Sequence, residues 1–479
     1  MKKNLHNTHG PILFIISSMV FILLSCAPGT YAMSIDEESK LGKEFLTSVN
    51  KELVIVDDAF VKEYITDLGN YLGQYQETKP FSLNFYIIKD NQLNAFAGPA
   101  GHVFVYSGLI NAMDQVDELA SVISHEIGHV SVRHLSSQAE KSKMIGIGTM
   151  AGILAGALIG GQAADAIIMG SMAAGIQKQL SYSRDDEREA DQLGFKKAYL
   201  AGFKPEGFIS ALAKLQQGQW GTDETPAYLL THPVDSERMS NLESLGHQYS
   251  SPTETAEAER FRGLYPFFRT IVKAQSSDPK DAERYFNLEL EKAPDSSLAH
   301  LGLGIALEKK GEYSSAIEHY NKALEGLTEK APILRYMGET YQMKGQVHDA
   351  INTFEKALEI NNKDKGTLYL LAMSYQDAEE YAKAVEIYGK LTFMDPVKDD
   401  VFYNLGLSLG RQGNLGLAHY NFGLYFKRVG ETDNAEFHFK KAGELAGNDQ
   451  VLQDKIKKEM EDMKKEKGKD KDKTMGPPG

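Results

Sequence analysis

A period of 34 residues organises the C-terminal half of the chain. Alanine recurs at one position of each copy, and an aromatic residue follows it four positions later. The residues at these two positions are Ala282, Ala316, Ala350, Ala384 and Ala418, and Phe286, Tyr320, Phe354, Tyr388 and Phe422. Small residues at a fixed position indicate helices that cross closely, and a period of this length predicts a stack of helical hairpins.

These units resemble tetratricopeptide repeats, which stack helix-turn-helix units into a solenoid. We therefore expect an all-α solenoid over residues 263–445, with a concave face suited to binding a peptide or protein. Residues 455–479 alternate Lys with Asp and Glu and end in Gly-Pro-Pro-Gly. Because they show no apolar stripe, we expect a frayed helix there that passes into a charged, disordered tail.

The region before the repeats, residues 34–250, mixes helical periodicity with two strand-like runs at residues 83–88 and 102–106. This pattern predicts a mostly helical α+β domain with a small sheet. The second run is either an ordinary strand or an edge that aligns an extended substrate.

The N-terminus predicts export. Two lysines precede an apolar stretch that is shorter than the ~20 residues of a membrane-spanning helix, so we interpret residues 1–25 as a signal peptide. Cys26 stands where a bacterial lipoprotein carries its lipid, which would anchor the protein to the outer membrane. The alternative is cleavage near Ala32, which would release a soluble periplasmic protein.

Composition limits the chemistry. Cys26 is the single cysteine, so any metal must be bound by His and carboxylate side chains. The chain has 52 Lys and Arg against 66 Asp and Glu, a net charge of −14, which disfavours binding to nucleic-acid phosphates. We therefore expect no nucleic-acid partner.

One motif predicts a zinc site. His125-Glu126-Ile127-Gly128-His129 lies in a stretch with a helical apolar stripe, from about residue 117 to residue 134. Residues four apart share a helix face, so His125 and His129 can bind one Zn²⁺ ion per chain. Glu126 then stands beside the open side of the ion and can act as general base toward a zinc-activated water.

A catalytic zinc of this kind needs a third protein ligand. The acidic segment from Ser183 to Asp191 offers Glu187, and Asp191 could accept a hydrogen bond from a ligand histidine. Glu189 would serve equally well by composition, and the acids could instead only complement a helix dipole. The residues themselves leave this choice open.

These motifs resemble the HtpX and CAAX prenyl endopeptidase family of zinc metallopeptidases over residues 34–250. The matching segments are Asn94-Ala95-Phe96-Ala97, the H-E-x-x-H motif with Arg133-His134, and Ser183-Arg184 with Glu187, Ala190-Asp191 and Gly194. The resemblance implies a zincin-like fold, metalloendopeptidase activity, Glu187 as the third zinc ligand, and Asp191 as the partner of a ligand histidine.

Thr231-His232-Pro233 resembles a segment whose histidine can take the fourth zinc position and hold such an enzyme inactive. The resemblance implies this regulatory role for His232, whereas the residues alone are compatible with a histidine in a surface loop. A Gly- and Ala-rich stretch at residues 144–176 predicts either a membrane-spanning helix or a helical hairpin over the active site.

An exported peptidase of this family followed by repeats resembles bacterial envelope proteases. The resemblance implies quality control or assembly of outer-membrane proteins, with misfolded or unassembled envelope proteins as substrates. The outer-membrane assembly machinery would be the partner of the repeats. The alternative is an envelope chaperone or adaptor that acts mainly through its repeats, with a zinc site kept closed by His232.

Overall fold

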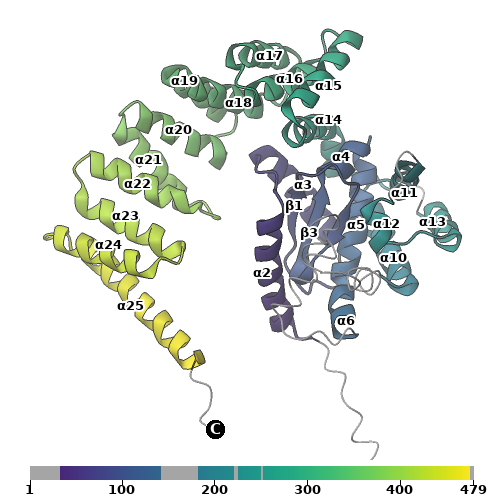
Figure 1. Ribbon diagram of the computed structural model, residues 1–479, viewed down its shortest axis with the longest axis horizontal. Coiled ribbons are helices and arrows are strands. Elements are labelled where there is room, and N and C mark those ends of the chain that lie inside the picture. Colours follow the sequence, from purple (N-terminus) through teal and green to yellow (C-terminus); the bar gives the residue numbers. More distant parts are fainter. Residues whose placement is uncertain (1–32, 142–181, 221–224, 250–251, 475–479) are drawn as a thin grey trace, which may run out of the picture. The chain divides into compact units, whose positions relative to one another are not determined.

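The computed structural model describes residues 33–141, 182–220, 225–249 and 252–474. Within these ranges the chain forms two compact units, which are considered separately (Figure 1). The first contains the residues up to Val56 and residues 62–265, and the second contains residues 57–61 and those from Pro266 onwards.

Two sequence predictions fall outside the described residues. They are the signal peptide with Cys26, and the Gly- and Ala-rich stretch at residues 144–176. Of the helices that the structure does describe, none has the length and apolar character needed to cross a membrane.

The first unit is mostly helical and contains one small sheet. The strands are β1 (Asn84–Ile88), β2 (Ala95–Ala97) and β3 (His102–Tyr106), and a 3₁₀ turn at Pro99–Gly101 leads from β2 to β3. The helices are α2 (Ile35–Glu52), α3 (Ala59–Gly73), α4 (Ser107–Ala112), α5 (Val116–Ser131), α6 (His134–Lys141), α10 (Arg184–Leu200), α11 (Glu206–Trp220), α12 (Ala227–Thr231), α13 (Ser236–Gln248) and α14 (Ala256–Ser276), which continues into the second unit.

The sheet is held by aromatic cross-strand contacts. Its order is β1-β3-β2, with β3 parallel to β1 and antiparallel to β2. Phe104 is paired with Tyr86 and with Phe96, and its ring stacks on theirs with centroid distances of 4.8 and 4.9 Å. The strands β1 and β3 correspond to the two predicted runs. Because β3 is the central strand and is paired on both sides, the alternative that this run is an edge for an extended substrate is wrong. Three-residue β2 is too short to show an alternating pattern.

Helix α5 is the centre of the first unit. Every one of its residues is buried, between the sheet and helices α10 and α11 (Figure 1). The helix ends at Ser131 and not at residue 134, because Arg133 adopts a left-handed conformation with φ of 57°. The predicted metal-binding motif therefore lies in the least accessible helix of this unit.

Two glycines allow α5 and α10 to approach closely. A Cβ atom added to Gly128 would lie 2.9 Å from the backbone oxygen of Ala190, and one added to Gly194 would lie 3.0 Å from the Cα atom of His125. Such distances leave no room for a side chain at either position. The two helices thus cross backbone to backbone at the motif itself.

The second unit is a stack of antiparallel helices in which each packs against the next. They are α15 (Pro279–Lys292), α16 (Ser297–Lys309), α17 (Tyr313–Gly326), α18 (Lys330–Met343), α19 (Val347–Ile360), α20 (Lys365–Asp377), α21 (Tyr381–Leu391), α22 (Asp399–Arg411), α23 (Leu415–Arg428), α24 (Thr432–Leu445) and α25 (Gln450–Thr474).

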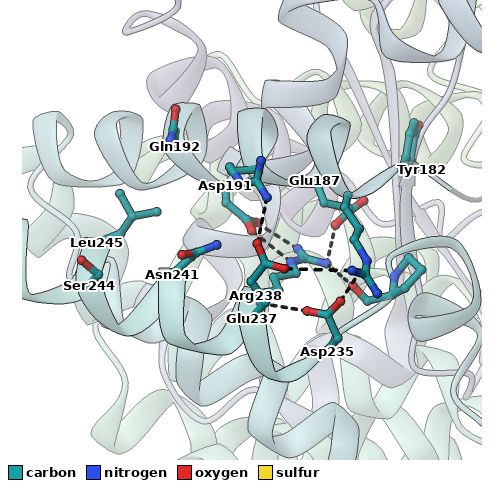
Figure 2. A pocket seen from close by; sticks show the side chains of 13 residues that line it. Tyr182, Glu187, Asp191, Gln192, Asp235, Glu237, Arg238, Asn241, Ser244 and Leu245 are labelled. Carbon is teal, nitrogen blue, oxygen red and sulfur yellow. Dashed lines mark hydrogen bonds and ion pairs between the residues drawn. The ribbon is translucent and has the colours of Figure 1, made fainter.

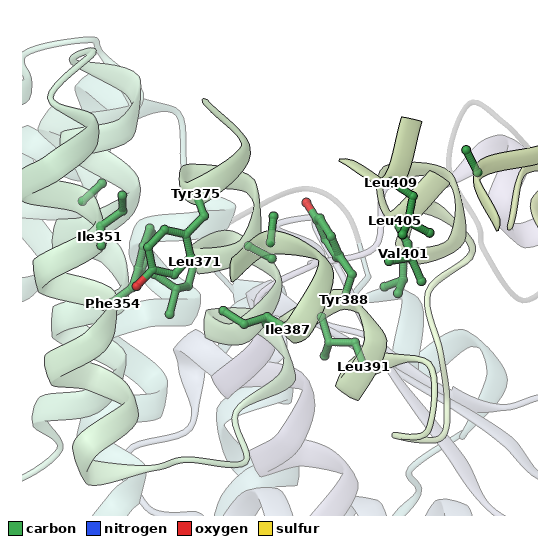
Figure 3. Packing of buried hydrophobic residues seen from close by; sticks show 14 residues of the cluster. Ile351, Phe354, Leu371, Tyr375, Ile387, Tyr388, Leu391, Val401, Leu405 and Leu409 are labelled. Atoms are coloured by element: carbon green, nitrogen blue, oxygen red, sulfur yellow. The ribbon is translucent and has the colours of Figure 1, made fainter. Parts of the chain in front are cut away.

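The period of 34 residues has a direct packing cause. The repeated alanines are buried, and in three of the five copies the repeated aromatic ring fills the space left by a glycine on the preceding helix. A Cβ atom on Gly304 would lie 2.6 Å from the Tyr320 ring, and one on Gly338 would lie 2.5 Å from the Phe354 ring. Figure 3 shows the continuous core that results, from Ile351 to Leu409.

The end of the chain differs from the sequence prediction. Residues 455–474, where a frayed helix passing into a disordered tail was expected, belong throughout to helix α25, in which Leu452, Ile456 and Met463 are buried. These residues pack with Phe439 of α24. Their spacing of four and seven forms a narrow apolar stripe, which the alternating charges of this segment obscure.

The fold class predicted from the sequence is confirmed. A mostly helical α+β unit with a small sheet is followed by an all-α stack of helical repeats.

The helix crossing makes a first prediction. The change Gly128→Ala should lower the free energy of unfolding by about 1–3 kcal/mol, because the new methyl group overlaps the α10 backbone. Gly263→Ala is the matched control, since no atom lies within 4 Å of a Cβ atom there and alanine favours helix by up to about 1 kcal/mol. Urea denaturation should show opposite shifts of the midpoint; equal midpoints would contradict the close crossing.

Candidate metal centre

Four buried side chains from three parts of the first unit meet at one point. His125 and His129 come from α5, Glu187 from α10, and His232 from the residue after α12, and one potential ligand atom of each lies within 4.8 Å of the others. Nε2 of His125 is 3.0 Å from Nε2 of His129 and 3.6 Å from a Glu187 oxygen. Nδ1 of His232 is 2.9 Å from Glu187 Oε1 and 3.4 Å from His125 Nε2.

These distances suit a tetrahedral ion. Ligand atoms at the usual 2.0–2.1 Å from zinc are about 3.3 Å apart, which is close to the separations of 2.9–3.6 Å given above. His232 is fully buried, and within the described part of the chain its Nε2 atom has no hydrogen-bond partner. A buried polar atom of this kind indicates a site built for a ligand. The donor set of imidazoles and a carboxylate fits zinc.

The first turn of α10 places the acidic partners. Ser183 and Asp186 form a capping box that starts the helix, and Glu187 and Asp191 follow one turn apart on the face toward α5. Nδ1 of His125 lies 2.9 Å from Asp191 Oδ1, which fixes the imidazole with Nε2 toward the other ligands. The carboxylate of Glu189 faces away and is not part of the group.

Burial sets the protonation of the group. It lowers the pKa of His125, of His129 and, to about 4, of His232, so all three imidazoles are neutral and have lone pairs available. Burial raises the pKa of Glu126 to about 7, partly offset by the nearby His232. A carboxylate with a pKa near neutrality is suited to both accepting and returning a proton.

Arg238 is the residue of this centre that the sequence did not indicate. It lies in the first turn of α13 and is 7% exposed. Its guanidinium donates to both oxygens of Asp191 at 2.9 and 3.0 Å, contacts Glu187, and donates to the backbone oxygen of Pro233 at 3.0 Å (Figure 2). Arg238 therefore neutralises two buried carboxylates and ties the segment of His232 to them.

Two tyrosines also hold ligand rings. Tyr182 stacks on His129 with a centroid distance of 3.8 Å, and Tyr228 stacks on His232 at 4.4 Å. Neither tyrosine belongs to a periodic pattern of the sequence. Arg238 was also not predicted, because the preceding residues Asp235-Ser236-Glu237 are typical of an exposed first helical turn. The only sequence signal for Arg238 was its position in the helix that starts just after Pro233.

Comparison with known proteins identifies both units. The model of peptidase family M48 matches residues 61–245, and a tetratricopeptide repeat model matches residues 272–332 and 369–419. A model described as anaphase-promoting complex, cyclosome, subunit 3 matches residues 309–391. The M48 model does not single out the HtpX and CAAX type of peptidase.

Three curated relatives are similar to part of the chain. The beta-barrel assembly-enhancing protease of Yersinia pestis is 31% identical over 232 residues, which is 48% of each chain. The putative protease of the same name from Vibrio cholerae is 33% identical over 45% of this chain and 46% of its own. Metalloprotease LoiP of Escherichia coli is 31% identical over 37% of this chain and 68% of its own. The chain thus spans about half the length of the first two relatives.

Arg238 provides the second prediction. Arg238→Met should destabilise the first unit by about 3–5 kcal/mol and weaken metal binding, because two buried carboxylates lose their counterion. Arg184→Met is the matched control, because Arg184 and Arg238 line one pocket (Figure 2). The side chain of Arg184 is 76% exposed, so its ion pair with Asp235 contributes at most about 1 kcal/mol. Thermal denaturation of both variants would test this; equal loss of stability would contradict the role of Arg238.

Proposed function

Because the chain belongs to peptidase family M48, we propose that it is a zinc-dependent endopeptidase. The observation that carries the proposal is the buried group of His125, His129 and Glu187, with Glu126 beside it. These three side chains would hold the ion, which when bound polarises a carbonyl group and makes a bound water acidic.

Side chains and backbone of the chain itself transfer the proton, position the ligands and align the substrate. The Glu126 carboxylate accepts the proton of the attacking water and passes it to the leaving amine. Asp191 and Arg238 hold His125 and Glu187 in place through the contacts described above. Strand β2 lies at one edge of the sheet and packs against α5, so it is the candidate edge for aligning an extended peptide.

Glu126 gives the third prediction. Glu126→Gln should reduce casein cleavage by about 100- to 10,000-fold, because glutamine cannot accept the proton, while the zinc content stays near one per chain. Elemental analysis and a casein assay on the same preparation measure both quantities. Cleavage at the wild-type rate would refute Glu126 as general base.

We further propose that His232 is a fourth ligand that restrains the enzyme at rest. Its burial and its distances to Glu187 and His125 support this assignment. A fourth protein ligand occupies the position that a catalytic water needs.

The fourth prediction follows from this restraint. His232→Ala should raise casein cleavage several-fold, because it opens the fourth position, and the zinc should be retained by the other three ligands. Unchanged or lower cleavage with zinc still bound would contradict a restraining role of His232.

For the cellular role, we propose quality control or assembly of outer-membrane proteins. The support is the names of the first two relatives together with the repeats of the second unit. The substrates would be misfolded or unassembled envelope proteins, and the repeats would dock on the assembly machinery. The protein would reside in the periplasm, anchored through Cys26 or released by cleavage near Ala32. Within family M48, the sequence motifs favour the HtpX and CAAX type of peptidase.

A second candidate function is an envelope chaperone or adaptor that works mainly through the repeats. The presence of His232 in the buried group supports it, because a fourth protein ligand would keep the zinc site closed. Rescue of an envelope defect by the Glu126→Gln variant, but not by a chain with disrupted repeats, would support the adaptor.

A further inference from the structure

His134 is a buried histidine next to the metal centre that the proposed mechanism leaves without a role. Its side chain is 6% exposed. Its Nδ1 atom lies 3.0 Å from Nδ1 of His129, and its Nε2 atom lies 3.2 Å from Glu189 Oε2 and 3.5 Å from Asp186 Oδ1. The imidazole therefore stands between a candidate zinc ligand and two carboxylates of α10.

His129, His134 and Glu189 form a row of hydrogen bonds, and the protons of the two imidazoles can be assigned from the atoms that their nitrogens face. The Nε2 atom of His129 faces the other ligand atoms, so its proton must be on Nδ1 when Nε2 binds a metal. His129 then donates to Nδ1 of His134, which leaves the proton of His134 on Nε2. That proton is donated to Glu189. In this assignment each ring nitrogen of His129 and His134 donates one hydrogen bond, accepts one or binds the metal, so neither imidazole needs a second proton.

The residue before His134 has a strained backbone conformation. Helix α5 ends at Ser131 and α6 begins at His134, and the left-handed Arg133 between them turns the chain back toward His129. A non-glycine residue avoids this conformation unless its surroundings hold it. Here Arg133 donates to Glu38 at 2.7 Å and to the backbone oxygen of Met33 at 2.5 Å. A strained residue fixed in this way indicates that the position of His134 matters.

The two motif histidines are thus held differently. Nδ1 of His125 meets the carboxylate of Asp191 directly, at 2.9 Å, whereas Nδ1 of His129 reaches the carboxylate of Glu189 only through the ring of His134. An outer partner of a metal-bound histidine fixes its tautomer and raises its basicity.

We propose that His134 is a positioning residue that holds His129 for zinc, as the middle member of a His129–His134–Glu189 row. The proposal rests on the proposed zinc site. It gives Glu189, which the sequence left as an alternative ligand, a separate function as the acceptor at the end of the row.

The test is the zinc affinity of the full chain, measured by competition with a chromophoric chelator. His134→Phe fills the space but accepts no hydrogen bond, and we expect it to weaken zinc binding by about 10- to 100-fold. His134→Gln keeps an amide oxygen for His129 and an amide nitrogen for Glu189, so it should restore most of the affinity. Equal affinities of wild type and His134→Phe, or equal losses in both variants, would overturn the proposal.

A second variant, at the exposed Glu189, separates an effect on zinc binding from a folding defect. The side chain of Glu189 is 55% exposed, so Glu189→Ala should leave the fold intact and weaken zinc binding several-fold. Glu243→Ala, which removes an exposed acid of α13, is the matched control and should bind zinc as the wild type does. A wild-type chain that binds no zinc would refute the zinc site itself, whereas normal zinc binding in Glu189→Ala would refute only the row.

Discussion

The close crossing of α5 and α10 is the contact on which the candidate centre depends. Glycines at the crossing remove the side chains that would separate the two backbones, and this brings the carboxylates of α10 within reach of the α5 histidines. The crossing also buries the carboxylates of Glu187 and Asp191 beside imidazoles that are neutral. Arg238 supplies the compensating charge, and its bond to the Pro233 carbonyl couples that charge to the segment of His232.

The second unit uses the same packing device for another purpose. A glycine on one helix receives the aromatic ring of the next, as in the pairs of Gly304 with Tyr320 and of Gly338 with Phe354. Phe422 packs against Gly406 in the same way, and the buried side chains from Ala350 to Ala418 form one continuous cluster along this part of the stack. The repeats thus provide a long surface for a partner, separate in construction from the metal centre.

The sequence predicted the features that follow from periodicity. The repeats, the helix of the zinc motif and the two longer strands were all predicted within a few residues, because each has a regular spacing of apolar side chains. Arg238, Tyr182 and Tyr228 could not be predicted, because none of them belongs to an apolar periodicity. Tyr182 precedes α10, Tyr228 lies in the five-residue helix α12, and Arg238 lies in the first turn of α13. His134 was visible only as part of a family motif; its role depends on the left-handed turn at Arg133, which no propensity indicates.

The central claim is that His125, His129, Glu187 and His232 bind one zinc ion in the resting protein. X-ray absorption spectroscopy at the zinc edge tests it most directly, because it reports the number of imidazole ligands. The account predicts four ligands at about 2.0–2.1 Å, three of them imidazoles, in the wild-type chain, and two imidazoles in His232→Ala. Two imidazoles in both proteins would exclude His232 as a ligand, and a chain without bound zinc would contradict the account as a whole.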